Sequence, residues 1–245
     1  MELQCGIAYG PIASRRFGRS LGVNLAPEGR KTCNFNCSYC QYGWTEFPAR
    51  GEFPKPADVI DAVDRALAQH PDVDAITVAG NGEPTLHPGF APIAEGLFGL
   101  RRQRAPKAKL VLLSNGSTLG RLDVVYSLAR FDARCMKFDA GDATTFRLMN
   151  AAMIPLARLV SDLRAVGRLT LQSMFVRDAE RTVDNTTPRA VDAWLGAVER
   201  IRPDSVDVYT LARPPARSTL IAAPREMLER IAARVVALGI PARVV

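Results

Sequence analysis

Short apolar segments alternate with amphipathic helical segments along most of this chain, and this alternation limits the possible folds more than any other feature. Segments with the pattern of buried strands recur at intervals of roughly 30 residues, which is the length of a strand–helix–strand unit. Each such unit places two strands side by side and parallel in one sheet. The sequence therefore predicts an α/β fold with parallel strands.

The individual elements follow from the periodicity of the apolar residues. Strands are expected at residues 21–25, 75–79, 110–116, 135–139, 169–176, 205–211 and 240–245. Helices are expected at residues 56–69, 90–104, 119–129, 142–149 together with 156–166, 187–201 and 224–238. A proline at the first position supports the start of the helix at Pro56, since its fixed φ suits a first helical turn.

Length and composition predict one globular domain. The chain has 245 residues, 47% of them hydrophobic and 23% charged, which is normal for one α/β barrel with a full core. No linker or low-complexity stretch divides it. We expect a single domain over 1–245: an N-terminal extension and first strand at 1–32, a cysteine loop at 33–40, the barrel at 41–215, and a C-terminal helix and strand at 216–245.

The sequence offers no sign of a membrane partner. No apolar run reaches the length that crosses a bilayer, and the first residues lack the basic and apolar regions of a signal peptide. We expect a cytoplasmic protein, where thiols stay reduced. The net charge of +7 would permit binding to RNA, but 27 of the 32 basic residues are Arg, so base composition of the genome explains the charge equally well.

Three cysteines lie within eight residues, at Cys33, Cys37 and Cys40. Three thiolates at these spacings can face one centre, but a structural zinc site needs four ligands. The next candidates, Cys5, Cys135 and His70, are not at a metal-ligand spacing. A [4Fe–4S] cluster held by three cysteines would leave one iron open to another ligand. A zinc site completed from elsewhere and a redox-active or disulfide cluster remain alternatives.

The motif Cys-x3-Cys-x2-Cys, with Tyr39 before the last cysteine, resembles the signature of the radical S-adenosylmethionine (SAM) superfamily. The resemblance implies a single partial (β/α)6 TIM-like barrel. It also implies that Cys33, Cys37 and Cys40 bind a [4Fe–4S] cluster, that SAM chelates the open iron, and that Tyr39 contacts its adenine. It also implies reductive cleavage of SAM to methionine and a 5′-deoxyadenosyl radical that abstracts hydrogen from a substrate. Such an oxidoreductase or transferase needs an electron donor such as flavodoxin or ferredoxin.

A glycine-rich turn follows the strand at residues 75–79. Glycines directly after a strand let a ligand approach the backbone closely. In the resembled family a Gly-Gly-Glu-type motif contacts the amino group of SAM at this place, and the matching residues here are Gly80, Asn81, Gly82 and Glu83. The intervening Asn81 is typical of the branch related to wyosine synthases, which modify tRNA.

Arg15, Arg16 and Arg19 lie in the turn before the first strand. The run Ser-Arg-Arg-x-Gly-x-Ser-Leu-Gly, beginning at Ser14, also resembles bacterial and archaeal relatives of the wyosine synthases. Arginines beside the cysteine loop could bind a phosphate or a carboxylate. A solvated basic turn is the alternative interpretation.

Further polar residues fall at the C-terminal ends of the expected strands, where parallel barrels carry their active sites. The resemblance assigns Ser114, Asn115, Asp139 and Gln172 to the sugar and carboxylate of SAM. Strand alternation places Lys137 and Asp139 on the inner face, either as an ion pair or in contact with a ligand. Lys137 and Tyr209 are the catalytic candidates, and Arg15, Arg16 and Arg213 are the substrate-binding candidates.

The substrate stays open between a small molecule, a peptide and tRNA, because a shared fold does not transfer a substrate. A function of a different class also fits the sequence. The protein would then be a non-catalytic zinc or iron–sulfur module that binds RNA or senses redox state. Such a module would bind metal without cleaving SAM.

Overall fold

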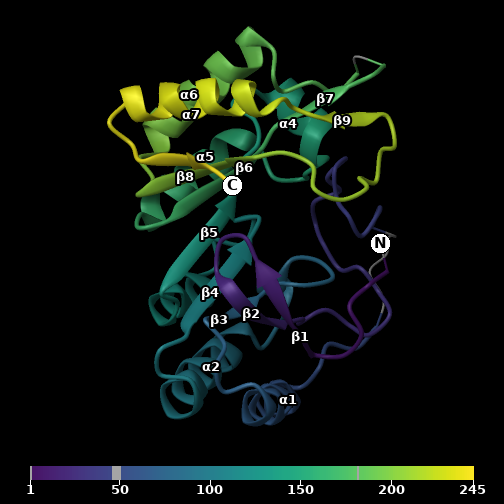
Figure 1. Ribbon diagram of the computed structural model, residues 1–245, viewed down its shortest axis with the longest axis vertical. Helices are drawn as coiled ribbons and strands as arrows, with labels where there is room; N and C mark the ends of the chain where they lie inside the picture. The colour runs from purple at the N-terminus through teal and green to yellow at the C-terminus, as the bar shows by residue number, and fades with distance from the viewer. Residues whose placement is uncertain (1, 46–50, 181) are drawn as a thin grey trace.

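A single sheet of eight strands organises the computed structural model, which describes residues 2–45, 51–180 and 182–245 (Figure 1). Six neighbouring strands run parallel, as the alternation predicted. They are β2 (Gly18–Val23), β3 (Ala75–Val78), β4 (Lys109–Ser114), β5 (Ala133–Lys137), β6 (Thr170–Met174) and β8 (Ser205–Tyr209). The predicted partial (β/α)6 barrel is therefore confirmed.

Each edge of this six-stranded sheet carries one more strand. At one edge β1 (Ala8–Ser14) pairs with β2 and runs antiparallel to it, and at the other β10 (Ala242–Val244) pairs in parallel with β8. The order β1-β2-β3-β4-β5-β6-β8-β10 does not close on itself, so the barrel is open. The antiparallel strand β1 was missing from the sequence prediction.

The connecting helices lie close to their predicted positions. They are α1 (Pro56–Gln69), α2 (Phe90–Arg104), α3 (Leu122–Ser127), α4 (Ala143–Asn150), α5 (Leu156–Val166), α6 (Pro188–Ile201) and α7 (Arg225–Ala237). The predicted helix at 119–129 was too long, because α3 begins at Leu122 and passes into a 3₁₀ turn at Leu128–Arg130. In the part of the chain that the structure describes, every helix is too short or too polar to cross a lipid bilayer.

Strand residues alternate between two environments, as the pleat of a sheet requires. Ile76, Met136 and Val206 belong to the large core between the sheet and the helices. Their neighbours face the other way, where Ala75, Val111 and Cys135 form a smaller apolar cluster with Phe17 from the β1–β2 turn. We call this second side the inner face of the sheet.

A small second sheet stands beside the barrel. It consists of β7 (Val176–Asp178) and β9 (Leu220–Ala222), which run antiparallel. The predicted strand at 169–176 therefore ends early: β6 stops at Met174, and the chain turns away so that Val176 can pair with Ala222.

Candidate functional site

The cysteine loop lies at the C-terminal end of the parallel strands and contacts the glycine-rich turn directly. Thr32, just before Cys33, forms a parallel bridge with Gly82. Its amide donates to Asn81 O at 2.7 Å, and the amide of Glu83 donates to Thr32 O at 2.9 Å. Two segments that the sequence analysis assigned to one site are thus held together by backbone hydrogen bonds.

The other side of the cysteine loop is held by the end of α4. The amide of Asn36 donates to Asn150 O, and the amide of Ser38 donates to Met149 O, both at 2.8 Å. The last carbonyls of a helix have no partner within the helix, so α4 is free to accept both bonds. The loop geometry is therefore fixed by residues more than a hundred positions away in sequence.

The thiols of the loop are partly shielded from water. Burial, followed by the neighbouring Cys37, raises the pKa of Cys33 to about 12, and burial likewise raises the pKa of Cys37. Burial without a cation disfavours the thiolate, while a bound metal favours it. These two cysteines are protonated near neutral pH unless metal replaces the proton.

The chemistry of the donor set fits an iron–sulfur cluster. Two side-chain amides point at the sulfurs: Asn115 Nδ2 lies 3.7 Å from Cys33 Sγ, and Asn150 Nδ2 lies 3.4 Å from Cys37 Sγ. N–H donors aimed at cysteine sulfur are a typical support of ligating thiolates. Within the described residues no group of three or more His, Cys, Asp or Glu side chains is arranged so that it could hold a metal ion, and this includes the three cysteines of the loop.

Glu83, Ser114 and Asn115 come together as the sequence analysis expected. The buried carboxylate of Glu83 accepts hydrogen bonds from Ser114 Oγ at 2.7 Å and from the Asn115 amide at 2.6 Å. Thr85 adds two more, from its amide and its hydroxyl. Burial raises the pKa of the Glu83 carboxyl, and these hydrogen bonds oppose the rise.

The glycine-rich turn is packed more tightly than the sequence indicates. A Cβ on Gly82, whose φ is +149°, would lie 1.7 Å from Thr32 O. The buried side chain of Asn81 exchanges two 2.8 Å hydrogen bonds with the backbone of Gln4. On Gly80 a Cβ would meet Asn24 Oδ1 at 2.5 Å. Gly80 and Gly82 leave no room for a side chain, and the side chain of Asn81 is bound to Gln4. All three residues therefore pack closely against neighbouring segments.

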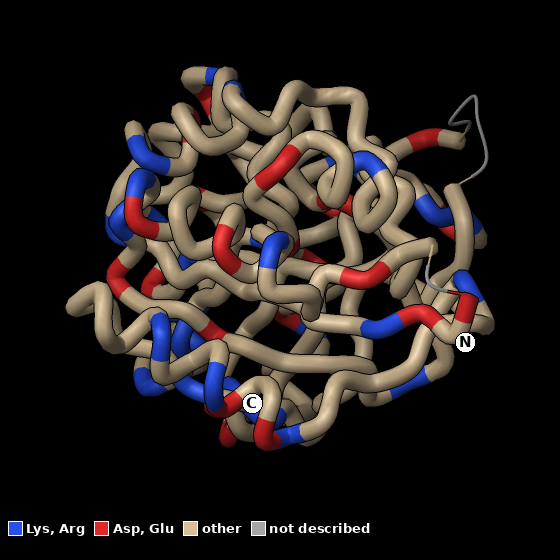
Figure 2. The backbone as a smooth tube through the Cα atoms, turned by 90° about the horizontal axis from the view of Figure 1, so that it is seen from above, with Lys and Arg blue, Asp and Glu red and all other residues tan. Residues whose placement is uncertain are grey.

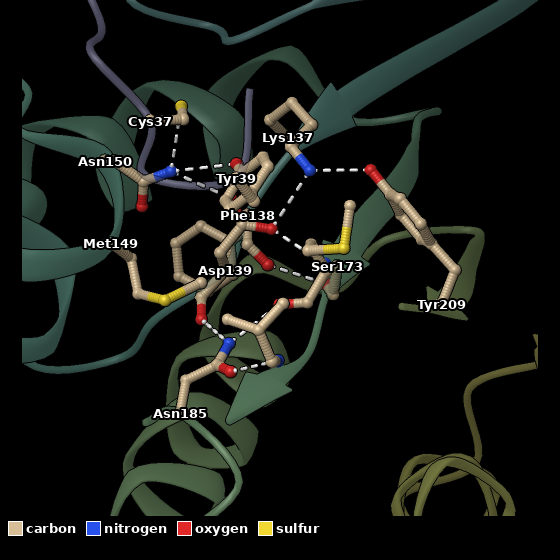
Figure 3. A network of polar contacts seen from close by, with 12 residues as sticks. Cys37, Tyr39, Lys137, Phe138, Asp139, Met149, Asn150, Ser173, Asn185 and Tyr209 are labelled. Atoms are coloured by element: carbon tan, nitrogen blue, oxygen red, sulfur yellow. Dashed lines mark hydrogen bonds and ion pairs between the residues drawn. The ribbon is translucent and has the colours of Figure 1, made fainter. Parts of the chain in front are cut away.

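Asp139 stands at the centre of a buried polar network on the inner face (Figure 3). Its carboxylate accepts from the Tyr39 hydroxyl, from Asn150 Nδ2 at 2.8 Å and from the Met174 amide at 2.8 Å. Burial, and next the charge of Asp139, raise the pKa of Tyr39, which therefore stays a neutral phenol. The network ties the cysteine loop to the ends of β5 and β6.

Lys137 forms the inward ion pair that was one of its two predicted interpretations. Its Nζ lies 3.1 Å from Asp139 Oδ1 and donates to the Tyr209 hydroxyl at 2.6 Å. It also lies 4.6 Å from the centroid of the Tyr39 ring. Burial by itself lowers the pKa of Lys137, but Asp139 and then Tyr209 raise it above the usual value, so the side chain is an ammonium.

The arginine candidates do not form a common clamp. The Arg19 amide donates to Asp74 just before β3, so the β1–β2 turn lies at the N-terminal end of the strands and not beside the cysteine loop as predicted. Arg15 is exposed. Arg16 reaches the inner face, with its guanidinium carbon 5.4 Å from the Tyr209 ring centroid. Arg213 lies at the other end, bonded to Gln41 beside the cysteine loop at 3.1 Å.

Gln172 lies next to Lys137 and Asp207 in the register of the sheet, also on the inner face. The sequence analysis missed two residues of this region, Asn150 and Asp207. Asn150 lies in no motif and is recognised only through its folded contacts. The alternation of strand 205–211 did place Asp207 beside Tyr209, which was a usable signal.

In the comparison with known families, the model of the radical SAM superfamily matches residues 30–148. This stretch includes the cysteine loop, the glycine-rich turn and all of β5 with Lys137 and Asp139.

Relatives of the chain carry the name UPF0026. The chain is 36% identical over 216 residues to a UPF0026 protein of Helicobacter pylori (strain J99), covering 85% of this chain and 67% of that protein. It is 32% identical over 218 residues to a UPF0026 protein of Synechocystis sp., covering 84% of this chain and 76% of that protein.

Three solved structures share the fold. A radical SAM methyltransferase from Sphaerobacter thermophilus superposes with a TM-score of 0.68 and 16% identity, over 92% of this chain and 66% of that one. TYW1 with a lysine–pyruvate adduct superposes with a TM-score of 0.62 and 12% identity, over 89% of this chain and 72% of that one. Native anSMEcpe with bound AdoMet superposes with a TM-score of 0.61 and 15% identity, over 91% of this chain and 63% of that one. The chain thus spans between 63% and 76% of the length of these five proteins.

Proposed function

Because this chain belongs to the radical SAM superfamily, whose cofactors are a [4Fe–4S] cluster and SAM, we propose that it is an oxidoreductase or transferase that abstracts hydrogen from its substrate. Cys33, Cys37 and Cys40 would hold the cluster. When bound, the reduced cluster supplies the electron that cleaves SAM to methionine and a 5′-deoxyadenosyl radical.

One observation carries this proposal: two amide donors from different elements aim at two sulfurs of the cysteine loop. Asn115 follows β4 and Asn150 ends α4, yet each points an N–H group at a candidate ligand. A disulfide or a free thiol pair needs no such donors. Ligating thiolates carry negative charge, which these N–H groups stabilise.

The glycine-rich turn and the β4 end would bind the polar end of SAM. Backbone groups of Gly80, Asn81 and Gly82 border the cysteine loop, and Glu83 brings Ser114 and Asn115 to the same place. Tyr39, the residue before the last cysteine, would contact the adenine. Asp139 and Gln172 complete the set of candidates for the sugar and carboxylate of SAM.

Lys137 and Tyr209 would act on the substrate. The ammonium of Lys137 donates to Tyr209 Oη, so the phenol accepts this bond and its own proton is left for another acceptor. Tyr209 can therefore donate a hydrogen bond, or a proton, to a group on the inner face. Lys137 would position Tyr209 through this hydrogen bond.

The substrate we favour is a small molecule. Ten arginines of the described residues form ion pairs with Asp or Glu. Figure 2 shows Lys and Arg interspersed with Asp and Glu along the chain. Modification of tRNA is the second candidate, favoured by the likeness to TYW1 and by the net charge of +7. An electron donor such as flavodoxin or ferredoxin, in the reducing cytoplasm, would complete the system.

The test is anaerobic reconstitution with iron and sulfide, followed by reduction with dithionite in the presence of SAM. We expect 5′-deoxyadenosine to form with the wild type and to be absent with the triple Cys33→Ala, Cys37→Ala, Cys40→Ala variant. The matched control is Cys5→Ala, an exposed cysteine outside the loop, which should retain the activity. A zinc-loaded wild type without SAM cleavage would instead support the non-catalytic module.

A further inference from the structure

Three polar side-chain atoms on the inner face are buried without a hydrogen-bond partner among the described residues. They are Arg16 Nη1, Gln172 Nε2 and Asp207 Oδ2. Gln172 and Asp207 are register partners on β6 and β8. The charges of Arg16 and Asp207 both act on the thiol of Cys135, two residues before Lys137 on the neighbouring strand β5, and the Gln172 side chain lies within reach of the same sulfur. The three atoms thus belong to one region.

Arg16 is the unbalanced charge of this region. Lys137 is paired with Asp139, and Arg243 donates to Asp207 Oδ1 at 2.7 Å, which leaves Oδ2 unused. No ion pair within the described part of the chain involves Arg16. Three cations therefore face two carboxylates, and the excess positive charge lies on Arg16.

The Arg16 side chain is half-buried, and among the described residues its guanidinium lies against two aromatic rings. The guanidinium carbon of Arg16 lies 5.4 Å from the Tyr209 ring centroid and 5.9 Å from that of Phe17. Such contacts offset part of the cost of removing a cation from water, but they satisfy none of its N–H donors. A guanidinium whose Nη1 is buried without a partner is complementary to an oxyanion, since its donors match the oxygens of carboxylate and phosphate.

A chain of contacts connects Arg16 to the cysteine loop. Arg16 and Lys137 contact the same ring, that of Tyr209, and Lys137 also contacts Tyr39. Figure 3 shows Lys137 and its bond to Tyr209 close to Tyr39. A ligand held by Arg16 would therefore lie against Tyr209, on the side of the inner face that leads to the proposed SAM site.

We propose that Arg16 binds the anionic group of a small substrate on the inner face, with Gln172 as a second N–H donor and Asp207 as an acceptor. The substrate class is a small carboxylate or phosphate that also carries an N–H or O–H group. This inference rests on the proposed function, because it describes the molecule from which hydrogen is taken. It also assigns Gln172 to the substrate and no longer to SAM.

The test is anion binding to the reconstituted enzyme, which is first saturated with SAM so that the carboxylate of SAM is not the ligand measured. Inorganic phosphate and malonate are titrated separately by calorimetry, and the anion that binds identifies phosphate or carboxylate as the preferred group. Arg16→Gln is compared with Arg102→Gln, a control at an exposed arginine of α2. We expect Arg16→Gln to bind the anion roughly tenfold more weakly or worse, and Arg102→Gln to bind like the wild type.

A third variant, Arg16→Lys, separates binding from folding. It keeps the charge but loses the planar fork, so it should retain the wild-type unfolding temperature with intermediate affinity. The proposal is wrong if neither anion binds the wild type, or if both arginine variants bind it equally. It is also wrong if Arg16→Gln loses affinity for SAM by the same factor, because the anionic group would then belong to SAM. Anion binding without any 5′-deoxyadenosine formation would refute the proposed function instead.

Discussion

Asn150 has the most concentrated set of contacts in the candidate site. Its side-chain N–H group is shared among Cys37 Sγ at 3.4 Å, the Tyr39 hydroxyl at 3.0 Å and Asp139 Oδ2 at 2.8 Å. The residue is 1% exposed, so water does not compete for these bonds. A neutral amide in this position stabilises negative charge on Cys37 and fixes Tyr39 at the same time.

Replacing Asn150 by Leu should lower the reduction potential of the cluster. Loss of an N–H donor to sulfur destabilises the more negative, reduced form. A loss of about 1 kcal/mol corresponds to a shift of roughly 40 mV for one electron. The measurement is a potentiometric titration followed by electron paramagnetic resonance.

The control for this prediction is Asn185→Leu. Asn185 is also buried and bonds to the same network, through the backbone oxygens of Asp139 and Met174, but it contacts no sulfur. The cluster in Asn185→Leu should have the same reduction potential as in the wild type. An equal shift in both variants would mean that the network acts by holding the fold and not through Cys37.

Gly82 links the glycine-rich turn to the cysteine loop at the level of secondary structure. Alanine at this position would put a methyl group 1.7 Å from Thr32 O, so the Thr32–Gly82 bridge must open. We expect Gly82→Ala to incorporate less iron and to unfold at a lower temperature, with a destabilisation above about 1 kcal/mol. Iron content and thermal unfolding measure the two effects.

Gly99→Ala is the matched control for that substitution. Gly99 lies within α2, and a Cβ there meets nothing within 4 Å. Since alanine is the better helix former, this variant should be as stable as the wild type or more stable by up to about 1 kcal/mol. Normal iron content in Gly82→Ala would contradict the role we give to the turn.

The start of α2 depends on a neutral histidine. Gly89, the residue before the helix, donates its amide to His87 Nδ1 at 2.9 Å, and His87 Nε2 lies 2.8 Å from Pro54 O. Burial lowers the pKa of His87 from its ordinary value of 6.5. The unfolded chain therefore takes up this proton before the folded protein does, so the free energy of unfolding falls as pH drops below about 6.5.

We expect the unfolding temperature to drop between about pH 7.5 and about pH 5.5 in the wild type, and to drop less in His87→Gln. His70→Gln, at the other histidine, should behave like the wild type. The account of α2 fails if all three proteins show the same pH dependence. Protonation of Nδ1 is the physical reason, because it removes the acceptor for the Gly89 amide.

The elements that the sequence predicted well are those with strong periodic patterns. The bounds of α1 and α2 agree with the prediction. The helix α1 carries a clear apolar stripe, and in α2 the buried residues Phe90, Ile93 and Leu97 recur at helical spacing. Strand β1 was missed because Pro11 interrupts it, and proline is tolerated in a strand only at an edge, which the sequence does not reveal. The three-residue strands β7 and β9 are too short to show a pattern.

The residues of the candidate site also differ in how well the sequence predicts them. Cys33, Cys37 and Cys40 lie in one local motif. Ser114 ends a strand, and Glu83 and Asn115 come after strands, so the sequence could place all of these residues. Asn150 acquires its role only when α4 docks on the cysteine loop. The inward direction of Arg16 also depends on how the β1–β2 turn folds over the sheet, which the spacing of three arginines does not encode.

At the scale of the whole molecule, basic and acidic side chains are interspersed along the chain, which disfavours a nucleic-acid surface. Ten arginines and Lys137, of 32 basic residues in all, form ion pairs with Asp or Glu within the described residues, and the net charge is +7. We expect bulk tRNA to bind weakly and to dissociate at about 150 mM salt, measured by fluorescence anisotropy. Saturable binding that persists at that salt concentration would favour the tRNA-modifying alternative.

The central claim is that the cysteine loop carries a cluster with one iron open to SAM, and the most direct test is the paramagnetic resonance spectrum of the reduced, reconstituted protein with and without SAM. We predict a [4Fe–4S] signal whose g-values change when SAM is added, because SAM becomes a ligand of the open iron. The change should be lost in Cys37→Ala. A spectrum that SAM leaves unaltered, or a protein that takes up zinc and no iron, would contradict the account.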